Sequence, residues 1–160
     1  FSNSKKNTNN TADETTSEQN NTSSPVPQTV NRQASFAIFT NGTFRVFTAS
    51  MYHNLSEDVF IQSDNPNLVH VKKVGTTWGD FFRTLPFELT RNCLTTGTKE
   101  TFCSKGENSL VFYLNGVRVD DVLDREIQAN DQLLISYGTQ KREEIQNQLQ
   151  KLRELVEEKQ

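Results

Sequence analysis

The distribution of hydrophobic and polar positions divides the chain into three parts. Apolar residues are sparse in residues 1–35, whereas residues 36–138 contain ten of the eleven Phe. Residues 139–160 are polar again but carry aliphatic side chains at regular spacing. We therefore expect a disordered Asn/Thr/Ser-rich linker or stalk, one globular domain and a separate C-terminal helix, with these boundaries.

Alternating apolar and polar positions predict strands at both ends of the middle part. Residues 35–47 alternate on either side of Asn41-Gly42, which predicts a hairpin with a type I′ turn and Val46 on its return strand. Residues 109–119 repeat this signature around Asn115-Gly116. Three further strands are expected at 58–62, 68–74 and 131–138, with "SDNPN" as the turn between the first two.

In "TTWGDFFRTLPFEL" the spacing of the apolar residues changes from that of a strand to that of a helix. Thr77, or Thr76 before it, is placed to cap this helix, and Asp80 stands at the reciprocal position of a capping box. Pro86 ends the helix. Its apolar side chains recur at helical spacing, and they are Trp78, Phe81, Phe82 and Leu85. Strands together with one short helix predict an α+β fold, a mixed sheet with the helix on one face.

A second helix is predicted for residues 139–160, which are otherwise rich in Gln, Glu, Lys and Arg. Its aliphatic positions follow steps of four, three and four residues and are Ile145, Leu149, Leu152 and Val156. So short a stripe makes a weak coiled coil. It fits a helix that folds back onto the domain, a homo-oligomer zipper or partner-binding helix, or a helix that continues beyond Gln160. Contact with a protein partner or a second copy through this stripe is our working hypothesis.

Three stretches resemble the second half of a β-grasp domain of the ThiS/MoaD, ubiquitin-like kind: "TTWGDFFRTL", "LVFYLNGVRV" and "IQANDQLLISYG". In that family Thr-x-Gly-Asp opens the helix, a strand ends in Asn-Gly, and the last strand follows an Asp-containing turn. The matching residues are Thr77, Gly79, Asp80, Tyr113, Asn115, Gly116, Asp131 and Ile135. Residues 36–138 are also similar to small uncharacterised extracytoplasmic prokaryotic domains with a paired-cysteine insertion and a terminal "ILISYG"-type strand.

The resemblance implies a β-grasp-like fold, but it indicates little about function because function resides in sites rather than folds. Sulfur carriers and ubiquitin-like modifiers of this family act through a free C-terminal Gly-Gly. Here Tyr137-Gly138 is followed by 22 residues that end in Gln160. We therefore do not expect carrier chemistry.

The two cysteines of the chain, Cys93 and Cys103, bound the segment "CLTTGTKETFC". A zinc clip needs closer cysteines and a second ligand pair, and a thioredoxin-like redox pair needs C-x-x-C at a helix start. We expect a disulfide across a hairpin turned by "TTGTK"; two buried thiols, or a redox or metal role, are the alternatives. A persistent disulfide requires an oxidising compartment. We therefore expect an extracytoplasmic domain, at the cell surface or in the periplasm, tethered to a membrane by a segment upstream of Phe1.

Charge and composition narrow the function classes. The net charge is −3 without a basic stripe, so we expect no nucleic-acid partner. No apolar run approaches the roughly 18 residues of a membrane span. The chain has no Gly-rich phosphate loop and neither the G-x-S-x-G nor the H-E-x-x-H motif. We accordingly expect neither an enzyme nor a bound cofactor.

The candidate metal ligands are scattered in the sequence. His70 shares a strand face with Lys72, whose ammonium repels cations, and His53 lies in a distant loop. The carboxylates of Asp120, Asp121 and Asp124 are expected to form a solvated turn. A metal centre is therefore not predicted.

The sequence favours a non-catalytic extracytoplasmic interaction module that binds a protein partner or self-associates. Besides the C-terminal stripe, the stapled insertion 93–103 and a sheet edge open to β-augmentation are candidate contact surfaces. A small-ligand-binding β-grasp module is the alternative, and a metal or redox protein is a weaker one.

Overall fold

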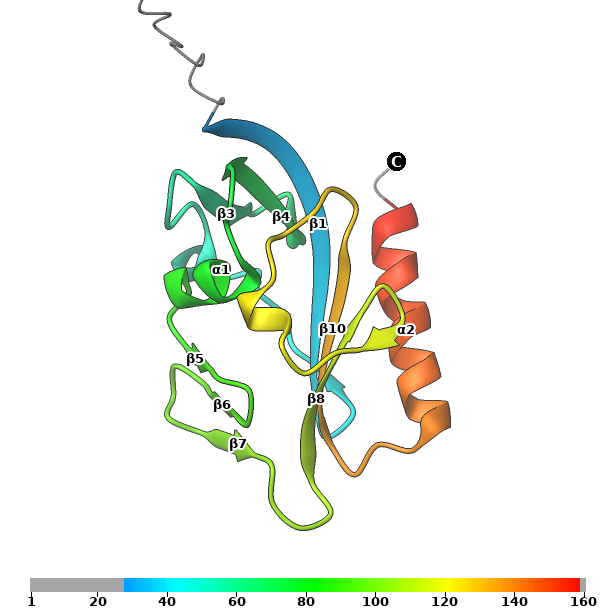
Figure 1. Cartoon of the computed structure of the whole chain (residues 1–160). Helices are drawn as coiled ribbons and strands as arrows, with labels where there is room; N and C mark the ends of the chain where they lie inside the picture. Colours follow the sequence, from blue (N-terminus) through cyan, green and yellow to red (C-terminus); the bar gives the residue numbers. More distant parts are fainter. Residues whose placement is uncertain (1–27, 159–160) are drawn as a thin grey trace, which may run out of the picture.

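A computed structural model of the chain describes residues 28–158 (Figure 1). The predicted α+β fold is confirmed. The strands are β1 (Thr29–Thr40), β2 (Thr43–Phe44), β3 (Val59–Gln62), β4 (Asn65–Lys73), β5 (Glu88–Leu89), β6 (Cys93–Thr95), β7 (Thr101–Cys103), β8 (Ser109–Leu114), β9 (Val117–Arg118) and β10 (Gln132–Gly138). The helices are α1 (Trp78–Thr84) and α2 (Arg142–Glu157), with two short 3-10 turns, η1 (Ser50–Tyr52) and η2 (Val122–Asp124).

The main sheet has seven strands in the order β3-β4-β1-β10-β8-β9, with β2 paired to β1. β1 and β10 are parallel neighbours at its centre, and every other pairing is antiparallel. In the central pair Phe36 lies beside Leu133 and Ile38 beside Ile135. The middle of the sheet therefore joins the first and last strands of the domain.

Helices cover both faces of this sheet (Figure 1). On one face Phe36 and Ile38 pack with Trp78, Phe81 and the other buried side chains of α1. On the opposite face Ala37 and Phe39 pack against α2. Because successive residues of a strand point to opposite faces, the run Phe36–Phe39 supplies both apolar layers.

The capping box predicted at the start of α1 and the Asn-Gly turns predicted for both hairpins are confirmed. The Thr77 hydroxyl accepts a hydrogen bond from Asp80 N at 3.0 Å, and the Asp80 carboxylate accepts one from Thr77 N at 2.9 Å. Asn41-Gly42 and Asn115-Gly116 both have positive φ at each residue, as a type I′ turn requires. Local hydrogen bonding and local backbone strain thus fix these three features.

The boundary predicted between linker and domain at residue 35 is wrong, because β1 begins at Thr29. This first half of β1 is polar apart from Val30, which packs against the core, and it is held mainly by pairing with β4. Thr29 lies opposite Lys73 and Arg32 opposite Val71. Arg32 also forms an ion pair of 2.8 Å with Glu126. The rest of the predicted linker, residues 1–27, lies outside the described residues.

Two strand boundaries also differ from the prediction. β2 has only two residues, after which the chain leaves the sheet, and Val46 is 63% exposed, away from the core. β4 begins at Asn65, so "SDNPN" contributes only its first two residues to the turn. In each case backbone pairing, which local composition does not report, sets the strand end.

α2 folds back onto the main sheet. Ile145, Leu149 and Leu152 are buried against the sheet, and Val156 is half-buried. The stripe proposed as a partner or homo-oligomer interface is therefore occupied by the protein's own strands. This is the fold-back arrangement, and it leaves three of the four hypothesised contact residues inaccessible to a partner.

Candidate functional site

The disulfide predicted between Cys93 and Cys103 is present. The two residues lie directly opposite each other in the β6–β7 pair, with their Cα atoms 4.1 Å apart. β5, β6 and β7 form a separate three-stranded sheet, which lies beside the main sheet on the α1 side (Figure 1). The insertion is therefore a stapled hairpin.

The stapled hairpin is anchored to the domain by its inward side chains. Leu94 and Phe102 are buried in the core that also contains α1. The Phe102 ring packs edge-on to Tyr137 of β10 at 5.2 Å between centroids, and the Tyr137 hydroxyl donates to Cys103 O at 3.3 Å. Covalent and apolar contacts together hold the hairpin in one position.

The tip of the hairpin is exposed but internally bonded. Lys99 N donates to Thr96 O at 2.9 Å, and Glu100 N donates to the Thr96 hydroxyl at 3.2 Å. Lys99 has φ of 71°, in the left-handed region. The hairpin therefore presents a defined turn to solvent.

Two adjoining crevices lie beside this hairpin. The first, of about 50 Å³, has apolar walls from Phe47, Tyr52, Phe87 and Leu94, with Arg45 and Val46 at its rim. The second, of about 420 Å³, shares Phe87, Thr96 and Gly97 with the first and adds Arg83, Glu88 and Lys99. We call Arg45, Val46, Phe87, Gly97 and Lys99 the hairpin surface.

The hairpin surface has an excess of positive charge. The Arg45 guanidinium lies over the Phe102 ring, 5.9 Å from its centroid. Arg83 is paired with Asp80, whereas Arg45 and Lys99 form no ion pair with any residue between 28 and 158. Among residues 28–158, Glu88 is the single acidic residue in the lining of the second crevice, and the first crevice has none. An apolar crevice next to two uncompensated cations is suited to an apolar side chain flanked by carboxylates.

The histidines have structural contacts. The His70 ring stacks on Phe60 at 5.1 Å between centroids, and burial together with nearby Lys72 lowers the pKa of His70. The His53 ring nitrogen Nε2 lies 2.8 Å from Phe47 O. Within residues 28–158 no group of three or more His, Cys, Asp or Glu side chains is arranged to hold a metal ion.

The Asp-rich turn is a set of surface ion pairs. Asp120 contacts Arg91 at 3.5 Å, and Asp121 contacts Arg125 at 3.0 Å. All four side chains are largely exposed.

Neither helix of the described segment is long and apolar enough to cross a membrane.

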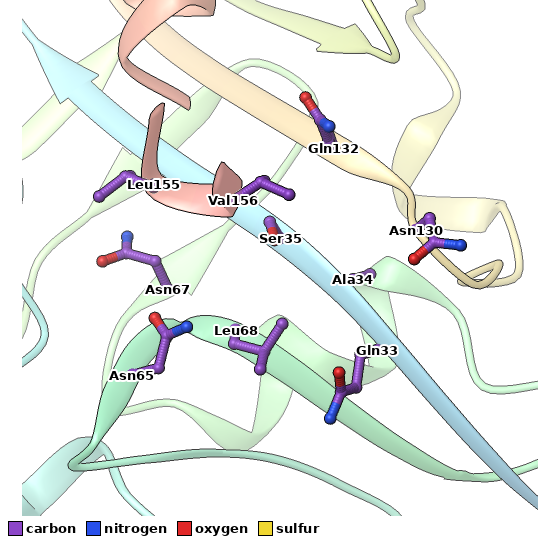
Figure 2. A pocket seen from close by; sticks show the side chains of 10 residues that line it. All are labelled: Gln33, Ala34, Ser35, Asn65, Asn67, Leu68, Asn130, Gln132, Leu155 and Val156. Atoms are coloured by element: carbon purple, nitrogen blue, oxygen red, sulfur yellow. The ribbon is translucent and has the colours of Figure 1, made fainter. Parts of the chain in front are cut away.

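A second site, which the sequence analysis missed, lies where the end of α2 passes over the main sheet (Figure 2). This pocket, of about 250 Å³, is lined by Gln33, Ala34, Ser35, Asn65, Asn67, Leu68, Asn130, Gln132, Leu155 and Val156. Five of these ten residues carry a carboxamide and none is charged, so we call it the amide pocket. Its members come from four distant segments. The sequence contains no signal for it, because its pattern predicts Gln33 in the linker and Asn65 and Asn67 in a turn, whereas the structure places all three in strands.

Comparison of the chain with protein-family models, curated proteins and solved structures yields no match.

Proposed function

We propose that the chain is a non-catalytic extracytoplasmic interaction module of β-grasp type that binds a protein partner through the hairpin surface. The observation that carries the proposal is a disulfide-stapled, core-anchored hairpin beside an apolar crevice with Val46 exposed at its rim. Rigid loops on a stable scaffold bind with little loss of conformational entropy. The geometry favours this surface over the stripe of α2, which the sheet covers.

The disulfide is consistent with a compartment other than the cytoplasm. Tethering to the cell surface by a segment upstream of Phe1 is part of the proposal. So is the relation to β-grasp domains, which rests on the motif residues from Thr77 to Ile135.

The partner that this surface fits is a protein segment with one large apolar side chain next to acidic residues. The apolar group would enter the crevice beside Phe87, and the carboxylates would face Arg45 and Lys99. Buried apolar anchors supply most of the affinity at such contacts, and rim charges mainly set association rate and specificity.

The test is partner capture from the native cell envelope with the full chain and two double variants. Val46→Asp with Lys99→Glu alters the hairpin surface. Val117→Asp with Lys105→Glu is the matched control, because Val117 is as exposed as Val46 and both residues lie outside the two crevices. Surface changes of this kind alter the free energy of unfolding by at most about 0.5 kcal/mol, which thermal unfolding verifies.

We expect the wild type and the control to retain the same envelope protein and the hairpin variant to lose it. Equal retention by all three proteins would contradict the proposal, as would the absence of any protein that the hairpin variant loses. Sedimentation of the wild type over a range of concentrations identifies self-association. If a second copy is the partner, the hairpin variant alone becomes monomeric.

A further inference from the structure

The amide pocket is built around one position along the strands of the main sheet, that of Ser35. Ser35 of β1 is paired with Leu68 of β4 on one side and with Gln132 of β10 on the other. Leu155 and Val156, in the last turn of α2, stand above these strands, and Asn65 and Asn67 extend from β4 toward Leu155 (Figure 2). The pocket is separate from the hairpin surface, with which it shares no lining residue.

Hydrogen bonds hold one carboxamide of the lining, and the backbone on the other side of the pocket, in place. Asn67 is only 8% exposed, and its amide nitrogen donates to Phe36 O at 3.0 Å. On the other side, Ser35 N donates to Asp131 O at 2.8 Å and Asn130 N donates to Gln33 O at 2.7 Å. A carboxamide fixed in this way loses little conformational entropy when it binds a ligand.

The charge of the pocket selects a neutral ligand. None of its lining residues is ionisable, and the cations of β1 and β4 have other partners. Arg32 pairs with Glu126, Lys72 donates to Asn31 and Lys73 lies 3.9 Å from Asp58. A phosphate or carboxylate placed here would lose its hydration without gaining an opposite charge, which is unfavourable.

The sheet topology argues against an extended peptide strand as the ligand. β1 is paired on both sides at this level, so the floor of the pocket has no free sheet edge for β-augmentation. The side-chain carboxamides are therefore the groups that would form hydrogen bonds with a ligand in this pocket. Each offers both donor and acceptor groups, as does each hydroxyl group of a sugar.

Part of the pocket lining is apolar. Leu68, Leu155 and Val156 add aliphatic surface beside the carboxamides (Figure 2). A neutral sugar ring has the complementary character, with hydroxyl groups around its edge and C–H groups on its faces. We infer that the amide pocket binds one neutral sugar residue, as a monosaccharide or as the end of a glycan, and that this is a second function independent of the hairpin surface.

The test is a titration of the full, isotopically labelled chain followed by NMR of its side-chain amides. The probes are the methyl glycosides of glucose, galactose, mannose and N-acetylglucosamine, with glucuronate and acetyl-tetraalanine amide as the anionic and peptide comparisons. We expect saturable shifts at Gln33, Asn65, Asn67 and Gln132 with at least one neutral glycoside. Replacing two carboxamides, by Asn65→Leu with Gln132→Leu, should raise Kd about tenfold or more.

The matched control is Gln146→Leu with Asn147→Leu, which changes the same two residue types on the exposed side of α2 and should leave Kd unchanged. Unchanged amide dispersion in both double variants shows that the fold is retained. The inference is overturned if no neutral glycoside gives saturable shifts at these amides, if glucuronate or the peptide binds there more tightly, or if the control weakens binding equally.

Discussion

The first turn of α1 is held by two reciprocal hydrogen bonds between Thr77 and Asp80. The backbone N–H of Thr77 is the main cause of the lowered pKa of Asp80, with smaller contributions from Arg83 and the Thr77 side chain and an opposing effect of burial. Because its folded-state pKa lies below the unfolded value, Asp80 binds protons less readily in the folded chain. Its stabilising contribution is present above the unfolded pKa of about 3.9 and is lost as pH falls through the lower folded value.

We therefore expect Thr77→Ala to lower the free energy of unfolding at pH 7 by about 1 kcal/mol. Asp80→Asn should remove part of the loss of stability that the wild type shows on acidification below about pH 4. Urea unfolding at neutral and acidic pH measures both effects. Asp124→Asn is the control, since the Asp124 carboxylate makes no hydrogen bond or ion pair with the described residues. An acid response of Asp80→Asn identical to that of the wild type would contradict this account.

At the scale of elements, the features that sequence predicts well are those with local causes. The Asn-Gly turns, the capping box and the cysteine pair each depend on neighbours within a few residues or on one covalent bond. The first half of β1 is different, because it depends on distant residues. Arg32 pairs with Glu126, 94 residues away, and the strand itself pairs with β4. The amide pocket was missed for the same reason, since only the folded sheet brings Gln33, Asn67 and Gln132 together.

The stapled hairpin should depend on its disulfide. Closing a loop of this length stabilises the folded state by about 3 kcal/mol through the lost entropy of the unfolded chain. We expect Cys93→Ser with Cys103→Ser to lower the free energy of unfolding by about 2–3 kcal/mol, and dithiothreitol to have the same effect on the wild type but none on the variant. Chemical unfolding with and without reductant measures this, and an effect below about 0.5 kcal/mol would mean that Leu94 and Phe102 alone anchor the hairpin.

At the scale of the whole molecule, the same aliphatic stripe on α2 fits a fold-back helix or an interface, and the sheet determines which one forms. The outer face of the sheet offers Ala37, Phe39, Val111 and Leu134 to the helix. A signal for this lies in the sequence, because "FAIF" in β1 and "LLI" in β10 are unbroken apolar runs, which are typical of strands buried on both faces. One helix, α1, covers only one face. The other face of the sheet therefore also had to be covered, and α2 covers it.

This role of α2 predicts that its stripe contributes to stability. Leu149→Ala removes a buried side chain from the layer between α2 and the sheet, so we expect the free energy of unfolding to fall by about 2–4 kcal/mol. Gln146→Ala, on the exposed side of the same helix, should change it by at most about 0.5 kcal/mol. Urea unfolding measures both variants, and sedimentation gives their masses. If Leu149→Ala instead kept wild-type stability and lowered the mass of an oligomer, the stripe would be an interface between chains, with α2 released from its own sheet.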